Sequence, residues 1–307
     1  MIPNLKAQSK WGWLVAAYLF LAGLGGGAYV TGAVAGFFGA EAWAGIAKIG
    51  VCLGFPCVAV GCIFLLADLG SPTKFWRAGM RPNTSWIARG TVIITVFMIL
   101  GFIHIVFGVW PSRGFAESTG ARQLISALGI IFAFGTMIYT GILLAASRPI
   151  AFWSTALLPL LFLVSALSTG IMAVVLIASL AGEAHAEPIH SLARIDVVLI
   201  ILEMFVLVFY LQGTHRVPES RASAQLVLTG SVAPLFWWGV AVLGLTAPLL
   251  LELLSMRALE GAGAVTVALL ASICGIIGGL FLRQVVLSGG IHAPLRAGRF
   301  EVALPIV

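Results

Sequence analysis

Charged side chains are scarce in this sequence. Asp, Glu, Lys and Arg together make up 9% of its 307 residues, whereas 61% are hydrophobic, and the mean hydropathy is +1.10. A water-soluble fold cannot bury that much apolar surface. The composition therefore excludes a soluble enzyme or a nucleic-acid-binding domain and indicates an integral membrane protein.

Metal-binding patterns are also missing. No CxxC spacing occurs among the cysteines, which are Cys52, Cys57, Cys62 and Cys274. The first three follow one another at steps that rotate each by about 140° on a helix, so they cannot converge on one metal ion. Only His104 among the histidines lies well inside an apolar run, which leaves no ligand pair for a transmembrane haem. We expect no haem, iron–sulfur cluster or metal ion held by this protein itself.

Long apolar runs, by contrast, are abundant. Crossing about 30 Å of hydrocarbon takes about 20 apolar residues in a helix. Runs of that length predict eight spans, at residues 11–38, 46–69, 87–110, 122–146, 154–181, 193–213, 230–256 and 263–288. The first run follows Lys6 and Lys10 as in a signal peptide, but it is too long for one, so we interpret it as a retained helix. The predicted fold class is an all-α integral membrane protein with eight transmembrane helices.

Two similar segments suggest an internal repeat. LFLAGLGGG in the first span resembles LFLVSALSTG in the fifth, and Gly23 and Gly27 fall where Ser165 and Thr169 fall. Such small-xxx-small patterns let helices approach closely. Four spans separate the copies, so both point the same way across the membrane. We predict two parallel four-helix bundles, at residues 1–150 and 151–307, although small residues are common in membrane helices in any case.

Basic residues are unevenly divided between the two faces. Ten lie in short segments on the side of the termini, namely Lys6, Lys10, Lys74, Arg77, Arg81, Arg148, Arg216, Arg221, Arg296 and Arg299. Five lie in the opposite loops, namely Lys48, Arg113, Arg122, Arg194 and Arg257. The positive-inside rule predicts that both termini are cytoplasmic. A basic face that docks an acidic partner would give the same asymmetry.

Polar side chains inside the apolar runs are costly and suggest function. Tyr18 and Tyr139 each lie about seven residues from the end of a predicted span, which places both rings roughly 10 Å deep on one side. Their hydroxyls and rings could face one pocket and bind an apolar ring with carbonyl groups, as in a quinone. The alternative for either tyrosine is an ordinary interfacial residue.

Several segments, in order along almost the whole sequence, resemble the NrfD family of membrane subunits, which includes that of polysulfide reductase. They read WGWLVAAYLFLAGLGGGAY, DLGSPTKFW followed by SWIARG, YTGILLAASRP, LLPLLFLVSALSTG and HSLARIDVVLIILEMF. The resemblance implies two four-helix bundles in a bacterial inner membrane and a menaquinone or ubiquinone site, with no other cofactor. It also implies a partner with [4Fe–4S] clusters and a molybdopterin-bearing catalytic subunit.

The resemblance also suggests roles for individual residues. Tyr139 matches a tyrosine that contacts quinone in the family, whereas Tyr18 stands where the relative has a histidine. A tyrosine exchanges protons near neutral pH less readily than a histidine. Asp68, which matches a family acid, is therefore the expected proton partner, with Arg89 holding or orienting it. A structural Asp68–Arg89 pair that fixes the hairpin is an equal alternative.

The polar hairpin at residues 65–90 is the predicted dock for the iron–sulfur subunit. Aromatic rings supply rigid contact area and basic residues supply complementary charge; they are Phe75, Trp76 and Trp86, with Lys74, Arg77 and Arg81. An interfacial aromatic and basic belt is the alternative. In the polysulfide enzyme the matching end is periplasmic, whereas here it is the basic end. The charge rule then places the soluble subunits in the cytoplasm, with a substrate such as sulfite.

A second polar set lies toward the opposite face. Asp196, Glu203 and Glu252 could relay protons between the quinone pocket and that face. The alternative is a surface pair of Arg194 with Asp196, and a protonated Glu203 held by a neighbouring hydroxyl.

Three functions remain open on the sequence alone. The first is a quinone-reactive subunit that does not itself act on the soluble substrate. A secondary transporter of a small solute is the second, although the repeat is parallel and no paired midplane break is evident. A purely structural anchor is the third.

Overall fold

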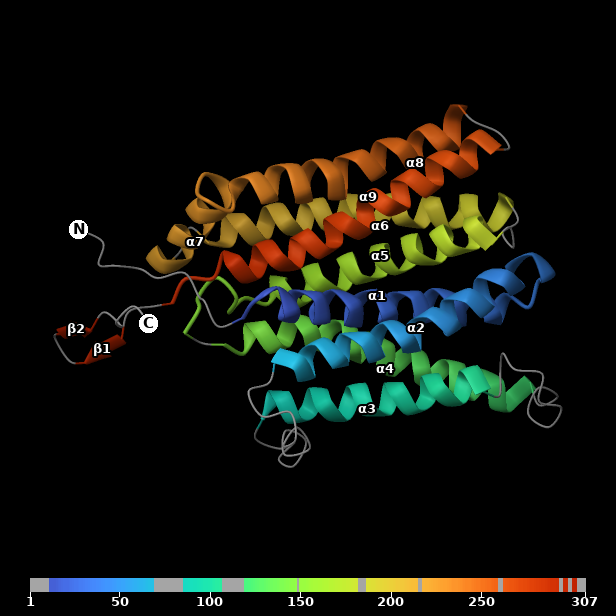
Figure 1. Cartoon of the computed structure of the whole chain (residues 1–307), viewed down its shortest axis with the longest axis horizontal. Coiled ribbons are helices and arrows are strands. Elements are labelled where there is room, and N and C mark those ends of the chain that lie inside the picture. The colour runs from blue at the N-terminus through green and yellow to red at the C-terminus, as the bar shows by residue number, and fades with distance from the viewer. Residues whose placement is uncertain are drawn as a thin grey trace.

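The computed structural model describes residues 11–68, 85–106, 119–147, 149–181, 186–214, 217–258, 262–292, 295–297 and 300–302. Long helices run side by side along the longest axis of the molecule (Figure 1). The helices of the first half are α1 (Trp13–Phe38), α2 (Glu41–Asp68), α3 (Trp86–His104) and α4 (Thr119–Ala145). The start of α1, the end of α2, the start of α3 and the end of α4 lie at one end of the bundle (Figure 1).

The second half has a similar sequence of helices. It contains α5 (Leu157–Ala181), α6 (Ala186–Gly213), the short α7 (Pro218–Leu228), the π-helix η4 (Leu235–Thr246), α8 (Ala247–Ala258) and α9 (Ala262–Ser288). A small antiparallel hairpin of β1 (Leu295–Ala297) and β2 (Phe300–Val302) follows, and it pairs Arg296 with Glu301. The described part of the protein is therefore helical apart from this hairpin.

Seven helical segments of the described residues are long and apolar enough to cross a membrane, with η4 and the first part of α8 counted as one. They correspond to seven of the eight predicted spans. The eighth, predicted at 193–213, lies within α6, which is a helix of 28 residues but is not among the seven. The protein is therefore a multi-pass membrane protein, while the count of eight spans and the two-bundle arrangement stay predictions.

Helix α1 lies at the centre of the molecule and packs against α2, α4, α5 and α9. Small residues make this possible. A side chain on Gly27 would collide with the carbonyl oxygen of Ala166 on α5, and one on Gly170 would collide with the backbone of Gly27 and Ala28. The two segments of the predicted repeat therefore cross each other at close backbone contact. Contacts between helices of the two halves thus join residues 1–150 to residues 151–307, whose division into domains stays a prediction.

The seventh predicted span, at residues 230–256, was expected to be an α-helix but is partly a π-helix, η4. In η4 the Thr246 hydroxyl donates a hydrogen bond of 2.8 Å to the carbonyl oxygen of Ala241, five residues earlier. Gly244 of this segment meets Gly278 of α9 with their backbones in contact, so a side chain on either glycine would collide with the other helix. The wider π-helix brings this backbone against α9 next to the buried polar residues of the second half.

Two features were not predicted from the apolar runs. Helix α7 begins with Pro218 in its first turn and carries many polar residues, so it contains no long apolar run. The C-terminal hairpin strands have three residues each and give no periodic signal of their own. Both segments are too short or too polar to be found by a search for spans.

Candidate functional site

Tyr18 on α1 and Tyr139 on α4 come together at one end of the first half. Tyr18 is fully buried and Tyr139 nearly so, and both belong to the same apolar cluster. Tyr139 lies within electrostatic range of the Tyr18 phenol. Among the described residues, nothing accepts or donates a hydrogen bond at the Tyr18 hydroxyl. The two rings therefore belong to one apolar cluster, in which the Tyr18 hydroxyl is buried without a partner among the described residues, while their role in a pocket stays a prediction.

Gly90 of α3 fixes where the Tyr139 ring can lie. A Cβ atom placed on Gly90 would collide with three carbon atoms of the Tyr139 ring. The ring therefore rests directly on the backbone of α3. Because a buried aromatic ring against a glycine has little room to turn, packing against α3 sets the position of the Tyr139 ring.

The first turn of α3 presents two further predicted residues. Ser85 caps this helix, because its hydroxyl accepts a hydrogen bond of 3.4 Å from the backbone amide of Ala88. The Arg89 guanidinium carbon lies 4.6 Å from the centre of the Trp86 ring, a cation–π contact. Both side chains are exposed, and so is Asp68 at the end of α2. The predicted docking residues Lys74, Phe75, Trp76, Arg77 and Arg81 lie outside the described residues.

A second buried polar cluster joins three helices of the second half. Arg283 on α9 donates hydrogen bonds of 2.5 Å to the Ser165 hydroxyl of α5, 2.9 Å to the carbonyl of Gly279 and 3.4 Å to the carbonyl of Phe162. Glu203 of α6 lies beside both Arg283 and Ser165. A cavity of about 10 Å³, lined in part by Ser165 and Glu203, lies in this cluster. That is about the room that one water molecule needs.

Asp196 and Glu252 form the far part of this cluster. Asp196 is fully buried, and Ser168 and Glu252 are the polar side chains that approach its carboxyl group. Neither Asp196 oxygen has a hydrogen-bond partner among the described residues, and Arg194 is exposed. The alternative of a surface pair between Arg194 and Asp196 is therefore wrong. Arg194 and Asp196 are two residues apart on one helix and so point in directions about 160° apart.

Sequence reasoning gave no role to Ser165, Ser168 or Arg283, although the structure places all three at this cluster. Ser165 was noted as a small residue in the repeat, whereas Arg283, a cation inside the predicted span 263–288, was given no role. The signal that could have found this cluster is Arg283 itself, because a basic residue in a membrane span is costly unless it has a partner. The partner itself was hidden, because Ser165 and Arg283 are far apart in the sequence.

His104 of α3 was singled out as the histidine deepest in a span. It is buried, and its Nδ1 atom lies 2.8 Å from the Tyr29 hydroxyl of α1. Its Nε2 atom lies 3.5 Å from the Ser126 hydroxyl of α4. Among the described residues, no three His, Cys, Asp or Glu side chains are grouped so that they could hold a metal ion. The hydrogen bonds of His104 with Tyr29 on α1 and with Ser126 on α4 therefore fix the orientation of the imidazole ring.

Comparison with known proteins gives a consistent result along the sequence. The family model described as "Polysulphide reductase, NrfD" matches residues 2–294. A component of the polysulfide reductase of Wolinella succinogenes is 31% identical over 265 residues, which cover 79% of this protein and 82% of that one. Protein NrfD of Escherichia coli is 28% identical, and the match covers 91% of this protein and 94% of that one. A component of the selenate reductase of Mesobacillus selenatarsenatis is 22% identical, and the match covers 86% of this protein and 72% of that one.

Proposed function

The protein belongs to the polysulphide reductase NrfD family, and we propose that it is the quinone-reactive membrane subunit of an oxidoreductase complex. Relatives are named as components of polysulfide and selenate reductases. In such a complex this protein binds menaquinone or ubiquinone and exchanges electrons with an iron–sulfur subunit, and a molybdopterin subunit acts on the soluble substrate. The membrane subunit then binds the quinone and transfers protons, and it does not itself act on the soluble substrate.

The observation that supports a quinone site most directly is the unpartnered hydroxyl of Tyr18. A buried hydroxyl without a hydrogen bond costs free energy, which a carbonyl acceptor on a bound ligand would recover. The neighbouring Tyr139 supplies a second phenol, and the apolar cluster around both suits an apolar ring and tail. A quinone supplies two-electron, two-proton redox chemistry. The residues present fit such a group.

Each residue at this end has a distinct part in the proposal. Tyr18 donates its hydroxyl hydrogen to a carbonyl oxygen, and Tyr139, held on Gly90, lines the ring position. Asp68 lies at the exposed end of α2, where a carboxylate can exchange protons with water. Arg89, which contacts Trp86 at the exposed start of α3, adds positive charge at the same end of the bundle. The tyrosines thus bind and orient, and the proton moves at Asp68.

The proposed dock for the iron–sulfur subunit is the hairpin at residues 65–90, at this same end of the bundle. Trp86 is 46% exposed, which makes it available for an interface. The basic loops favour cytoplasmic termini and soluble subunits on the cytoplasmic side of a bacterial inner membrane, where the substrate is an anion such as sulfite. Docking at this end would put the iron–sulfur subunit on the same side of the membrane as the tyrosine pair.

Proton transfer through the second half completes the proposal. Asp196, Glu203 and Glu252 are buried at the cluster with Arg283, and the small cavity there has room for about one water molecule. Buried carboxyl groups near a water site are suited to pass protons. We assign the relay to these three acids, with Ser165 and Ser168 between them.

The test begins with purification of the tagged protein from its native membrane in mild detergent. Iron, molybdenum and a quinone in the same preparation are the expected result, with the soluble subunits identified by mass spectrometry. A stable preparation that lacks all three, and that moves a solute across vesicles unaided, would instead establish the transporter.

A matched pair of variants tests the site itself. Tyr18→Phe removes the unpartnered hydroxyl and should weaken quinone binding about tenfold, the value of one hydrogen bond. Tyr210→Phe is the control, because it removes another fully buried phenol whose hydroxyl bonds the carbonyl of Phe152. Equal quinone retention in both variants contradicts the assignment of Tyr18.

A further inference from the structure

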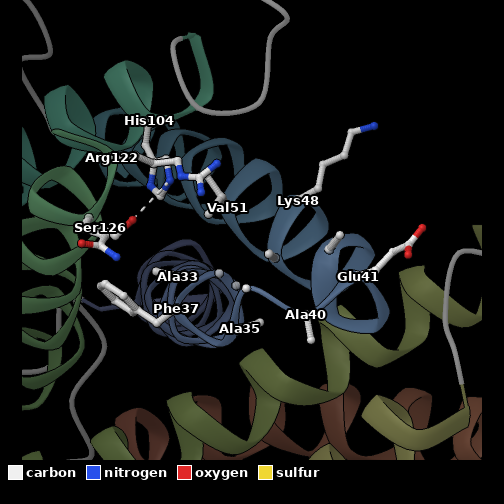
Figure 2. Close-up of a pocket in the computed structure, with 16 residues that line it drawn as sticks. Ala33, Ala35, Phe37, Ala40, Glu41, Lys48, Val51, His104, Arg122 and Ser126 are labelled. Atoms are coloured by element: carbon white, nitrogen blue, oxygen red, sulfur yellow. Dashed lines mark hydrogen bonds between the residues drawn. The ribbon is translucent and has the colours of Figure 1, made fainter. Parts of the chain in front are cut away.

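A cavity of about 360 Å³ lies at the opposite end of the first half from the tyrosine pair. The end of α1 and the start of α2 form one wall, made mostly of small apolar residues such as Ala33, Ala35 and Val51 (Figure 2). The end of α3 and the start of α4 form the other wall, which carries His104, Arg122, Gln123 and Ser126. The cavity is therefore apolar on one side and rich in hydrogen-bond donors on the other.

Two basic side chains meet on the polar wall. Figure 2 shows the Arg122 side chain beside the His104 ring. The bonds of His104 to Tyr29 and Ser126 hold the ring in place, so its Nε2 edge faces Ser126 in the wall of the cavity. A guanidinium and an imidazole are thus presented to the same space by two different helices.

Among the described residues that line the cavity, the acids do not balance the bases. Glu41 is the acidic residue among those that line the cavity, and its carboxylate points away from Arg122 and His104 (Figure 2). Helix α4 has no acidic residue in its first turn, where Arg122 lies. A cation at the positive end of a helix dipole is unfavourable unless an anion lies nearby. The described residues therefore leave a place for an anion.

We propose that this cavity binds a phosphate group, carried by an anionic phospholipid headgroup or supplied as free phosphate. The forked guanidinium of Arg122 matches two phosphate oxygens, and the positive end of the α4 helix dipole favours the same group. Ser126, whose hydroxyl is held by the His104 ring, can donate a further hydrogen bond. The apolar wall from α1 and α2 suits the glycerol and upper acyl groups of a lipid, which favours the lipid source.

Binding to the purified complex is measured by native mass spectrometry after delipidation. The probes are phosphatidylglycerol, phosphatidylcholine and inorganic phosphate. The native protein should bind phosphatidylglycerol more tightly than phosphatidylcholine. Arg122→Gln should lower the affinity for phosphatidylglycerol about tenfold. Competition by inorganic phosphate at equal concentration assigns the site to the free ion, and its absence assigns the site to the lipid.

Two further variants separate the cavity from general charge effects. Gly36 lines the cavity, and a Cβ there would meet only Ala47 Cβ, at 3.9 Å, so Gly36→Leu fills the space while keeping Arg122. This variant should also lower the affinity for phosphatidylglycerol about tenfold. Arg194→Gln removes an exposed cation of α6 that does not line the cavity and should change binding less than twofold. Native-like affinity in both Arg122→Gln and Gly36→Leu, with unchanged thermal unfolding, overturns the proposal.

Discussion

The guanidinium of Arg283 on α9 donates a hydrogen bond of 2.5 Å to the hydroxyl of Ser165 on α5. The same group reaches the carbonyl of Phe162 and lies beside Glu203 on α6. One cation therefore connects three helices within the interior of the second half. A basic side chain in a span is costly unless such partners accompany it, which explains why Arg283 can be fully buried.

Loss of this cation should destabilise the protein strongly. Arg283→Met keeps an unbranched apolar stem but removes the positive charge beside Glu203 and the donor to the Phe162 carbonyl. Removing one partner of a buried ionic group costs about 3–5 kcal/mol, because the remaining charge stays uncompensated. Thermal unfolding in detergent, followed by circular dichroism, measures the change.

The matched control is Arg194→Gln, which removes an exposed arginine of the neighbouring helix α6. This change should lower the free energy of unfolding by less than about 0.5 kcal/mol. Combining Arg283→Met with Glu203→Gln should recover part of the loss, because the second change neutralises the remaining carboxylate. Additive losses in the double variant contradict a coupling between Arg283 and Glu203.

Gly90 offers a test of how the Tyr139 ring is held. Gly90→Ala places a methyl group where the Tyr139 ring now lies, so the ring or α3 must shift. Overpacking of this kind costs about 1–3 kcal/mol and should also reduce quinone content in the purified complex. The measurements are thermal unfolding and quinone extraction from the same preparation.

Gly120→Ala is the control for the glycine change. Gly120 is helical at the start of α4, and a Cβ there would meet no atom within 4 Å. Alanine should therefore leave the stability unchanged or raise it slightly. If Gly90→Ala behaves in the same way, the ring of Tyr139 is not fixed by α3.

The apolar runs predicted most of the helices, because hydropathy is a local property that the sequence carries directly. Helix α2 begins at Glu41, ahead of the predicted 46, and α6 begins at Ala186, ahead of 193. Both helices extend beyond their apolar runs into more polar residues, where hydropathy gives no signal. The π-helical part of the seventh predicted span was also missed, because its backbone depends on the contact between Gly244 and Gly278.

The sites were predictable only in part. Tyr18 and Tyr139 could be placed together because depth along a helix follows from counting residues. Partners across helices could not, since Ser165 and Arg283, or Tyr29 and His104, meet only through packing. The alternative of a surface pair of Arg194 with Asp196 failed for a different reason, because nearness in sequence does not place two side chains on one face of a helix.

Docking of a soluble partner can be tested on the hairpin at residues 65–90. Trp76→Ala combined with Arg77→Glu removes an aromatic anchor and reverses a charge. We expect the partner to dissociate during purification, while the protein stays in the membrane. Co-purification at the native ratio, measured by quantitative mass spectrometry, contradicts the docking hypothesis.

The control for that experiment is an exposed tryptophan in the other half. Trp238 on η4 is 71% exposed, and Trp238→Ala should leave the yield of the co-purified partner unchanged. Loss of the partner in this variant as well indicates a general effect on the membrane domain rather than a specific interface.

Glu203→Gln tests whether proton transfer through the second half is coupled to quinone turnover. Glu203 is buried beside Ser165, Arg283 and a cavity with room for about one water molecule, and glutamine has nearly the same shape but does not exchange protons. We expect quinone turnover to continue while the membrane potential generated per turnover falls by about half or more, since the relay loses one member. The measurement is turnover and potential in the same proteoliposomes, and Glu187→Gln, at an exposed acid in the first turn of α6, is the control. An unchanged ratio of potential to turnover in Glu203→Gln would discard the relay and leave Glu203 as a structural partner of Arg283.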